Sequence, residues 1–529
     1  MAEEHTYLFI IEAPGKRKAL SATLEKLGIS GQVFSTNGHI LQNDKSLWPI
    51  GITKNFIETN RRPIRPELCE ELIALSSHFS RVIIATDPDD EGHVIASDIA
   101  RLLTHHQAVY RALCYGFDEL SMRKALSSLT YIDHGKATPG NVRRVIDRWI
   151  GSTFSSKEKG IGVGRIITGA LALANKIPVT LGYLPIEIAS SDGGGAFRAN
   201  IPLNRDNLQD VDLMVEEVAS IGALDVDRKE VETASRPYDH VDMVLALSKK
   251  TGESIKVIEE RLQRFYEGQH ISYPRTDCHS FNRHTVKMAE ELAHHNHIKI
   301  RSDFYPINDD EHAHESIHIL DTRYNVNEEI AEGTDKEILQ FIGREFLRAA
   351  QASIAVYPDL RGAPQWVKEQ IWKRQFAMQN GWHDKADPPA GQPVMLTKEQ
   401  AALQFLHEQG LGRPGTMVSH AVRLTSKPLL TDEFELTQLG REYLSIAPTP
   451  LFNGDVHQLL ERIGNVDLPM DVTEQMRIFY ALERSGLLAS SGLDEQAIRI
   501  IKDSLEDYKD GTLDNHPEMP KVNTNPDMT

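Results

Sequence analysis

Two unbroken apolar runs mark the first hundred residues of the chain, at 7–11 and 82–85. Such runs predict strands that are buried on both faces, as in a parallel sheet. Each run is followed by a polar turn and then by apolar residues at helical spacing, over 20–27 and 94–103. The repeated order of strand, turn and helix indicates α/β architecture.

Acidic residues stand at the ends of both predicted strands. They are Glu12 after the first strand and Asp87, Asp89 and Glu91 after the second. Because ligands of open α/β sheets gather at the carboxyl ends of the strands, we expect these carboxylates to lie together. Grouped carboxylates stay ionised most easily around a cation, and all-oxygen ligands suit Mg²⁺. The alternative is a solvated acidic turn or a helix N-terminus, where negative charge is favoured.

The rest of the chain alternates between helical and strand-like patterns. Apolar residues at helical spacing predict a helix over 254–266, which Gly268 ends. Residues 182–236 and 347–382 indicate mainly β structure, and residues 400–425 predict a helix, a turn and a second helix. The acidic stretch 501–529 predicts a helix that fades into a disordered tail.

The segment after the helix at 254–266 carries Tyr273 and, two residues later, Arg275. A phenol oxygen can attack phosphorus, and a guanidinium can hold phosphate oxygens in a bidentate fork. A tyrosine near an arginine is more often part of the packing or the surface, so the pair alone is weak support for catalysis.

The composition is typical of an ordinary multidomain protein. The chain has 529 residues, of which 40% are hydrophobic and 25% charged, so a large core is possible. No apolar run reaches about 18 residues and no secretion signal is visible, so we expect no membrane span and a cytoplasmic location. The three cysteines form no Cys-x-x-Cys pair, so neither a disulfide framework nor a zinc ribbon is predicted.

The net charge of −18 argues against an exterior that binds nucleic acid. A protein that closes around one strand needs only a basic groove, however. Basic residues do cluster, although a single cluster is usually a solvated face. The clusters are Lys16-Arg17-Lys18, Arg61-Arg62 with Arg65, Arg143-Arg144 with Arg148, and Lys157 with Lys159.

Motifs along the chain, in order, resemble those of type IA DNA topoisomerases. Asp87-x-Asp89-x-Glu91-Gly92, with Glu12, resembles the Toprim domain, the metal-binding module of topoisomerases and bacterial primases. Residues 271–278 resemble the family's active-site segment in the Tyr-Pro-Arg form of the topoisomerase III branch. Further similar segments lie at 35–40, 143–148, 164–167, 313–317, 411–416 and 436–440, so that the resemblance covers roughly residues 6 to 480.

The resemblance implies a multidomain fold of α/β, α and β parts, with an N-terminal Toprim domain followed by a toroidal type IA core. We expect no C-terminal zinc-binding extension. The expected parts are the Toprim domain at 1–135, a helical DNA-binding base at 136–180 and 391–490, a β-rich arch at 181–238 and 345–390, a tyrosine-bearing domain at 239–344 and an acidic tail at 491–529.

The resemblance also implies a reaction. Tyr273 would attack one DNA strand and become joined to its 5′ phosphate, another strand would pass, and the free 3′ hydroxyl would reverse the ester. Catalysis would use Tyr273, Arg275, Glu12, Lys16 and His314, with Mg²⁺ held by Glu12, Asp87, Asp89 and Glu91. DNA would contact His39, Arg143, Arg144, Asp147, Arg148, Gly164, Arg165, Glu315 and Arg413.

No nucleotide cofactor is implied, because the chain has no Gly-x-x-x-x-Gly-Lys-[Ser/Thr] loop and the tyrosyl ester conserves the bond energy. We expect a monomer whose partner is single-stranded DNA within duplex, in the manner of nucleoid-associated bacterial enzymes.

The chain departs from the family pattern at Asp90, His93, Ile167 and His318, where the family usually has Arg, Glu or Gln, Gln, and Arg. The subfamily, topoisomerase I or III, stays open, and so does the preference for relaxation or decatenation. Two alternatives remain. A different Toprim enzyme, a nuclease or primase, would not need Tyr273; a topoisomerase-like DNA-binding protein without catalysis would form no covalent adduct.

Overall fold

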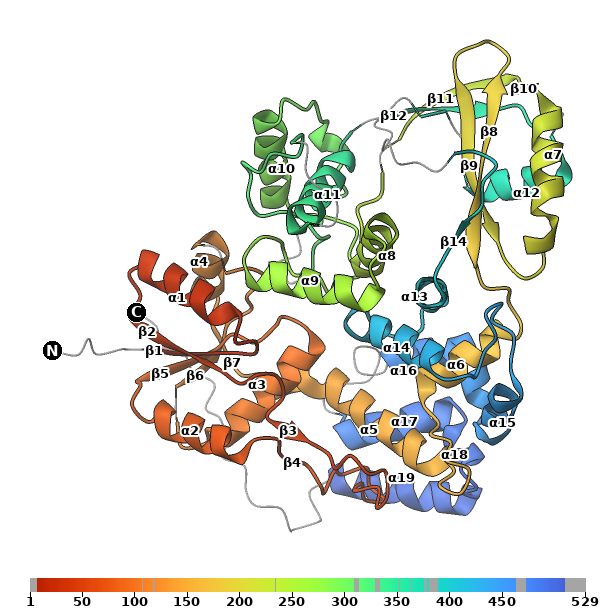
Figure 1. Ribbon diagram of the computed structural model, residues 1–529. Coiled ribbons are helices and arrows are strands. Elements are labelled where there is room, and N and C mark those ends of the chain that lie inside the picture. The colour runs from red at the N-terminus through yellow and green to blue at the C-terminus, as the bar shows by residue number, and fades with distance from the viewer. Residues whose placement is uncertain are drawn as a thin grey trace.

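The computed structural model describes most of the chain. The described ranges are 7–106, 108–117, 119–233, 235–308, 314–328, 334–351, 353–361, 363–374, 378–379, 389–462 and 472–509. Within these ranges, no helix is both long and apolar enough to cross a bilayer. In Figure 1 the parts of the chain follow one another around a ring: a sheet with helices, a helical base, a β-rich arch and a second helical part next to the sheet. The predicted multidomain fold with an N-terminal α/β domain is confirmed.

The N-terminal part is an α/β domain built on a five-stranded sheet. Its elements are β1 (Tyr7–Ile11), α1 (Lys16–Lys26), β2 (Gly31–Ser35), α2 (Pro66–Ser76), β5 (Arg81–Ile84), α3 (Asp90–Leu102), β6 (Val109–Arg111), α4 (Glu119–Ser127) and β7 (Thr130–Tyr131), with a small ribbon of β3 (Leu41–Gln42) and β4 (Arg62–Pro63). The strand order is β2-β1-β5-β6-β7, and β7 alone in this sheet runs antiparallel to its neighbour.

Both faces of strand β1 are buried, as its unbroken apolar run predicts. Leu8 and Ile10 share a core with residues of α2 and α3, whereas Phe9 and Ile11 share another with residues of α1 and α4. Helices therefore cover the two sides of the sheet, as Figure 1 shows, and the carboxyl ends of β1 and β5 lie next to each other in the parallel register.

Helix α3 begins at Asp90, earlier than the predicted start at residue 94. Asp89 caps it, because its Oδ1 accepts a hydrogen bond from the backbone N–H of Gly92 at 2.7 Å. The acidic turn after β5 is therefore also the first turn of a helix, where the dipole favours negative charge. The start predicted for α3 is too late because the hydrophobic pattern takes only the apolar residues into account.

The helical base is assembled from two separate stretches of sequence. Its elements are η1 (His134–Ala137), α5 (Thr138–Phe154), α6 (Arg165–Ala174), α13 (Lys398–Glu408), α14 (Pro414–Ser426), α15 (Gln438–Ile446), η4 (Thr449–Phe452), α16 (Gly454–Arg462), α17 (Glu474–Arg484), α18 (Leu487–Ser490) and α19 (Glu495–Lys509). The helix, turn and helix predicted over 400–425 are α13 and α14.

In α19, Leu505 is buried and Ser504 forms a hydrogen bond with Asn55, so the segment predicted as an acidic tail begins as a packed helix. The predicted disordered residues 510–529 lie outside the described ranges.

The arch is less purely β than predicted. Its elements are β8 (Gly182–Ser190), β9 (Ala196–Leu203), η2 (Leu208–Asp210), α7 (Val211–Ile221), β10 (Ala223–Leu224), β11 (Val226–Thr233), β12 (Ser353–Pro358), α12 (Gln365–Arg374), β13 (Met378–Gln379) and β14 (Val394–Met395). The prediction was wrong for α7 and α12. Val211, Met214, Val215, Val218 and Ile221 recur at helical spacing and cover the core of this part.

The remaining part holds the predicted nucleophile. Its elements are α8 (His240–Thr251), α9 (Ile255–Glu267), α10 (Arg283–His295), η3 (Ser302–Phe304) and α11 (Asp335–Arg348). The predicted helix is confirmed as α9, which Ser254 caps and Gly268 ends. A bridge between Ile271 and Ile319 then anchors the start of the segment that carries Tyr273.

Candidate active site

The carboxyl ends of β1 and β5 carry the predicted acids, and the tyrosine segment reaches the same place. The hydroxyl of Tyr273 donates a hydrogen bond to Oδ2 of Asp89 at 2.6 Å, across 184 residues of sequence. Tyr273 is only 3% exposed, so water is largely excluded from this contact. The fold brings the predicted nucleophile to the predicted acidic turn.

A buried lysine stands among these acids. Lys16, the first residue of α1, forms an ion pair with Asp87, and both side chains are buried. Its Nζ also lies 4.4 Å from the ring centroid of Tyr266, which adds a cation–π contact. A fixed ammonium in a water-poor site can stabilise negative charge on a phosphate.

The positive charge of Lys16 does not balance the carboxylates around it. Burial, together with the negative charge of Asp87, raises the pKa of Glu12 to about 7, although Lys16 lowers it in part. Asp89 adds a further negative charge that raises it. A divalent cation would relieve this repulsion, and the all-oxygen donors Glu12, Asp87 and Asp89 fit Mg²⁺.

Glu91, the fourth predicted ligand, makes other contacts in this structure. Its carboxylate lies 3.1 Å from Nε2 of His39 and 3.0 Å from Nη2 of Arg143. Burial alone would raise the pKa of Glu91, but His39 and Arg143 lower it to about 2. Glu91 is therefore a stable carboxylate at the edge of the acidic group, where a cation would have to replace two existing partners.

Tyr273 is flanked by groups whose polar atoms are not all used. Its ring stacks on His314, with centroids 5.7 Å apart and planes at 26°. Among the described residues, neither Nδ1 of His314 nor Nε of Arg275 has a hydrogen-bond partner, and both atoms are buried. Burial, followed by the charges of Asp89 and Asp87, raises the pKa of Tyr273 well above its usual value, so the phenol is neutral before reaction.

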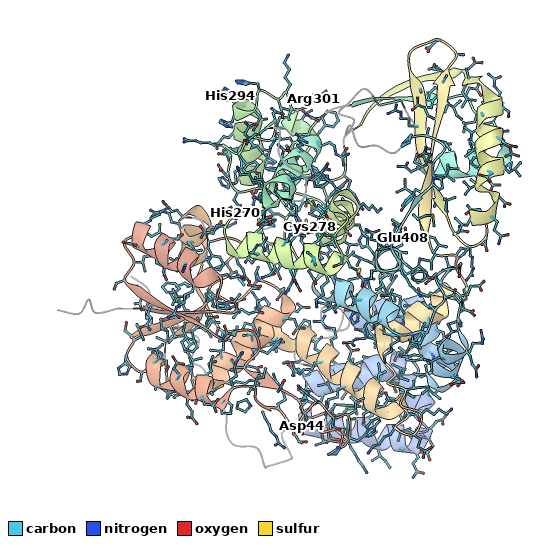
Figure 2. The ribbon with its side chains drawn as sticks, viewed as in Figure 1. Asp44, His270, Cys278, His294, Arg301 and Glu408 are labelled. Carbon is cyan, nitrogen blue, oxygen red and sulfur yellow. The ribbon has the colours of Figure 1, made fainter. Side chains whose placement is uncertain are left out.

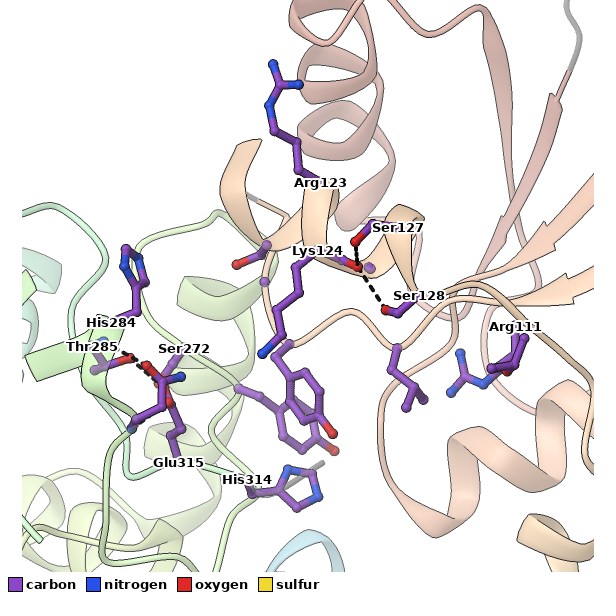
Figure 3. A pocket seen from close by; sticks show the side chains of 18 of the residues that line it. Arg111, Arg123, Lys124, Ser127, Ser128, Ser272, His284, Thr285, His314 and Glu315 are labelled. Carbon is purple, nitrogen blue, oxygen red and sulfur yellow. Dashed lines mark hydrogen bonds between the residues drawn. The ribbon is translucent and has the colours of Figure 1, made fainter. Parts of the chain in front are cut away.

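A cavity of about 1030 Å³ opens beside Tyr273 (Figure 3). Arg123 and Lys124 of α4 line it on one side and His284 and His314 on the other, as the labelled side chains show. The excess of basic groups suits an anionic ligand, and the volume is large enough to take a nucleotide-sized group.

Glu315 also lines this cavity, but its carboxylate is occupied. Its oxygens accept from the backbone N–H of Asn282 at 2.9 Å and from Oγ1 of Thr285 at 2.8 Å. Glu315 thus fastens the first turn of α10, next to the cap formed by Asn282. This contact supports a structural role rather than the predicted direct contact with DNA.

Three of the predicted DNA-binding arginines meet around Glu461 of α16. Arg165 donates to Glu461 at 2.7 Å and to Asp147 at 2.8 Å, and Arg413 donates to Glu461 at 2.8 Å. Arg143 lies 3.7 Å from the same carboxylate. Arg413 also forms an ion pair with Asp90, which joins the base to the first turn of α3.

The other predicted DNA contacts are also engaged by the protein. Arg144 binds both carboxylate oxygens of Glu58, the shortest contact being 2.6 Å. Arg148 donates to backbone carbonyls in the loop between β3 and β4. The backbone N–H of Gly164 donates to the hydroxyl of Tyr443 at 2.8 Å. The contacts of Arg144 and Arg148 hold the base against the N-terminal domain, and that of Gly164 lies within the base.

The residues at which the chain departs from the family pattern can be located in the structure. Asp90 pairs with Arg413, as described above, and Ile167 is buried in α6. His93 lines the cavity beside Tyr273, and burial followed by the charge of Arg111 lowers its pKa to about 4. His318 is buried against the ring of Phe346.

Sequence reasoning missed Glu461, Glu58 and Tyr266. Each lies in an ordinary helical or loop pattern, and no local motif marks it. A signal for the two glutamates is visible only once the arginines are placed, because a buried guanidinium needs acceptors around it, and Tyr266 becomes apparent only as the ring beside Lys16.

Comparisons with known proteins agree with these observations. The profile of the Toprim domain matches residues 7–113, and the profile of the DNA topoisomerase family matches residues 132–386. Reverse gyrase 2 of Aeropyrum pernix is 29% identical over 233 residues, which are 42% of this chain and 19% of that protein. DNA topoisomerase 1 of Aquifex aeolicus is 25% identical over 300 residues, which are 53% of this chain and 54% of that protein.

A solved structure, full-length topoisomerase I from Thermotoga maritima, aligns with 94% of this chain and 90% of its own length, at a TM-score of 0.56 and 17% identity. This likeness shows a shared fold. The chain spans about half the length, or less, of the two curated relatives named above. Because a Toprim domain and a DNA topoisomerase domain follow each other here in the order that the sequence motifs predict, the chain belongs to the type IA DNA topoisomerase family.

Proposed function

We propose that this chain is an ATP-independent type IA DNA topoisomerase, which cuts one DNA strand, lets another strand pass and reseals the cut. The observation that carries the proposal is the buried contact between the hydroxyl of Tyr273 and Asp89, with Lys16, Arg275 and His314 around it. Acids of a Toprim domain and a tyrosine from a distant segment are the two halves of such a site.

In the reaction, Oη of Tyr273 attacks the phosphorus of a single-strand phosphodiester. The P–O3′ bond breaks, Tyr273 becomes joined to the 5′ phosphate, and the 3′ oxygen leaves as a hydroxyl. Attack by that hydroxyl on the same phosphorus restores the strand and frees the tyrosine. The ester conserves the bond energy, so no nucleotide is consumed.

The residues around Tyr273 suit these proton and charge movements. Asp89 already accepts the hydrogen bond of the phenol and can take its proton as the bond to phosphorus forms. Glu12, whose burial raises its pKa to about 7, can give a proton to the leaving 3′ oxygen near neutral pH. Lys16 and Arg275 would stabilise the phosphate oxygens, and Nε of Arg275, which has no partner in the described part of the chain, can donate to one of them.

Mg²⁺, when bound, would supply further positive charge next to the phosphate and hold the cut ends for resealing. The residues that would hold it are Asp87 and Asp89, together with Glu12 once Glu12 has given up its proton, with Glu91 at the edge. Glu91 would have to exchange His39 and Arg143 for the ion.

The substrate in this proposal is a single-stranded segment of DNA. Arg143 and Arg413 are the arginines best suited to meet it, since their side chains are 15% and 29% exposed, whereas that of Arg165 is 3% exposed. DNA phosphates would replace Asp90 and Glu461 as partners of these two arginines. We expect a DNA-associated monomer that relaxes negatively supercoiled DNA or decatenates.

The test is a covalent trap. The protein is incubated with a single-stranded oligonucleotide labelled at its 3′ end, with and without Mg²⁺, and then denatured. We expect labelled protein from the wild type and none from Tyr273→Phe. Tyr266→Phe is the matched control, because this tyrosine lies 5.3 Å from Tyr273, ring to ring, and its hydroxyl has no partner among the described residues.

Tyr266→Phe should form the adduct as the wild type does. Cleavage that persists in Tyr273→Phe would indicate a different Toprim enzyme, a nuclease or primase. Retained DNA binding without any wild-type adduct would indicate a topoisomerase-like binding protein, and Asp90 and His93 would then be the first positions to restore.

A further inference from the structure

The segment that carries Tyr273 is held in different ways on its two sides. In Figure 2 the labels of His270 and Cys278 mark its two ends. On the amino-terminal side, the bridge between Ile271 and Ile319 fixes the segment through main-chain contacts. The half that follows the tyrosine, which contains the catalytic arginine, is held by a residue of another helix.

That residue is His240, the first residue of α8. Its Nδ1 lies 2.9 Å from the carbonyl oxygen of Pro274. Its backbone N–H donates a hydrogen bond to the carbonyl oxygen of Thr276, also at 2.9 Å. These two carbonyls stand on either side of Arg275 in the sequence. A single residue therefore holds the main chain both before and after Arg275.

Both bonds follow from the way in which α8 begins. The first N–H groups of a helix have no acceptor within the helix. Asp239 caps α8 by accepting from the N–H of Asp242 at 2.8 Å, so that the N–H of His240 is available to an acceptor outside the helix. Because a carbonyl can only accept, Nδ1 of the His240 ring carries a proton. The start of α8 thus presents two donors to the Tyr273 segment.

The ring of His240 is fixed in this orientation. The residue is 1% exposed, so the surrounding side chains leave the ring no room to turn into solvent. Its other nitrogen, Nε2, has no hydrogen-bond partner among the described residues. The nearest acid, Glu259 of α9, lies 3.7 Å from Nε2, which is too far for a hydrogen bond. The hydrogen bond that the ring makes in the described part of the chain is therefore the one from Nδ1.

The helical base confines the side chain of Arg275 and fixes the start of α8. A β-carbon at Gly415, in the first turn of α14, would lie 3.3 Å from Cδ of Arg275, so the arginine passes close to this helix. Nε2 of His407, in α13, donates to Oδ2 of Asp239 at 2.9 Å. A shift of the main chain at Arg275 would therefore move the guanidinium relative to α14.

We propose that His240 is a positioning residue for Arg275. Its ring and its backbone N–H fix the two carbonyls around Arg275, so that the guanidinium meets the phosphate that Tyr273 attacks. This inference rests on the proposed function, in which Arg275 stabilises the phosphate oxygens. His240 itself touches no reacting atom. It acts through geometry, and a misplacement of about 1 Å in a catalytic group can slow a reaction by about 10²-fold.

Two amide substitutions separate the roles of the two ring nitrogens. Asparagine places its NH₂ group close to the position of Nδ1, whereas glutamine places it close to that of Nε2. His240→Asn should keep the bond to Pro274 and form the adduct within about 2-fold of the wild-type rate, whereas His240→Gln should lose the bond and be slower by about 10-fold or more. Single-turnover cleavage of labelled single-stranded DNA, with protein in excess, measures both rates.

A double-mutant cycle tests whether His240 acts through Arg275. In an Arg275→Ala background, His240→Gln should cause no further slowing, because the group that it positions is gone. A second slowing of about 10-fold in that background would overturn the proposal. Equal slowing by His240→Asn and His240→Gln would also overturn it, since the loss would then not follow the donor at Nδ1.

The matched control is His106→Asn. It removes a histidine donor from a carbonyl at the amino end of β5, opposite the acids, where Nε2 of His106 lies 2.8 Å from the oxygen of Phe79. This variant should cleave DNA as the wild type does. Slowing equal to that of His240→Gln would show that losing any such bond slows the reaction and would overturn the proposal. Thermal unfolding checks that all variants fold.

A second measurement needs no catalysis. Hydrogen exchange followed by mass spectrometry should be faster over residues 271–278 in His240→Gln than in the wild type, and unchanged in His240→Asn. Unchanged exchange in His240→Gln would overturn the positioning, whether or not DNA is cut. A wild type that forms no adduct would overturn the proposed function instead, and exchange would still decide whether His240 holds the segment.

Discussion

The cavity beside Tyr273 and the arginine network around Glu461 both adjoin the start of α3, through Asp89 and Asp90, but their polar groups differ in how they are paired. In the pocket, Nε of Arg275 and Nδ1 of His314 lack partners among the described residues, and Glu12 is buried near like charges. In the network, Arg165 and Arg413 each bind carboxylates of the protein itself. Near Tyr273 some donors have no partner among the described residues, whereas Arg165 and Arg413 are paired with carboxylates of the protein.

This difference shows that the role of a buried charged side chain depends on whether the protein supplies its partners. A buried arginine with two carboxylate partners holds the fold together, and losing one partner destabilises the protein. A buried polar atom without a partner near Tyr273 is a donor or acceptor that a substrate could use, although such atoms also occur elsewhere in the described part of the chain. The same residue type, arginine, therefore has different roles at positions 165 and 275.

The largest effect is expected where the network is broken. Arg165→Ala removes buried, charge-assisted hydrogen bonds to Asp147 and Glu461, each worth about 1.5–3 kcal/mol, and should lower the free energy of unfolding by about 3–5 kcal/mol although Glu461 keeps Arg413. Urea unfolding followed by circular dichroism measures this loss. Arg198→Ala is the control, because Arg198 makes an exposed ion pair with Glu187 and should cost less than about 1 kcal/mol. Equal losses would remove the structural role assigned to Arg165.

The next effect concerns the pocket. Arg275→Ala should slow adduct formation about 10²–10³-fold, the usual result of deleting one donor to a developing negative charge. The folded state should lose little stability, because Nε of Arg275 has no partner among the described residues. Single-turnover cleavage of labelled DNA measures the rate. An unfolding loss as large as that of Arg165→Ala would make Arg275 a structural residue like those of the network.

A third test uses acid. Burial would raise the pKa of Glu461, but the charges of Arg165 and Arg413 lower it to about 2. The unfolded chain, with a carboxyl near its usual pKa of 4.5, binds the proton more readily. The ion pairs therefore contribute their full stability above about pH 5 and lose it as the pH falls toward 2.

The unfolding temperature of the wild type should fall through this window, and Glu461→Gln should fall less steeply from its own lower starting value. Parallel curves for the two proteins would show that Glu461 is not the titrating group, and Glu58, paired with Arg144, would be the next candidate.

The smallest effect is expected at Asp90. Asp90→Asn releases Arg413 from one carboxylate and should raise affinity for single-stranded DNA several-fold. The dependence of log K on log salt should steepen by about 0.7, one additional phosphate contact. Asp303→Asn, an equal change of charge in an exposed pair with Arg301, is the control. Fluorescence anisotropy at several salt concentrations measures both, and equal slopes would contradict the release of Arg413.

Local hydrophobic patterns correctly predicted helices and strands that bury one or both of their faces. The apolar run of β1 and the helical spacing of α9 are visible in the sequence, because a few neighbouring residues decide them. The composition over α7 and α12 predicts strands, although the apolar residues of α7 recur at helical spacing. The start of α3 was missed because a cap, not an apolar residue, begins that helix.

The sequence motifs assigned Tyr273 and Asp89 to the same hypothetical active site. They did not predict that the two side chains are in contact. Their hydrogen bond depends on how two domains pack, which no local pattern records. The carboxylate partners of the arginines could not be predicted from the sequence for the same reason. Glu461 lies in a common helical pattern, and only its neighbours in space give it a role.

One carboxylate in this structure serves two purposes with two separate oxygens. Oδ1 of Asp89 caps α3, and Oδ2 receives the hydroxyl of Tyr273. An alanine at position 89 would therefore remove both the helix cap and the hydrogen bond to Tyr273, and its effect on the proposed reaction could not be assigned to either one. Asparagine separates the two, because its amide oxygen keeps the cap while its NH₂ can no longer accept a proton. In a genetic screen for activity, position 89 should thus tolerate few substitutions, for two independent reasons.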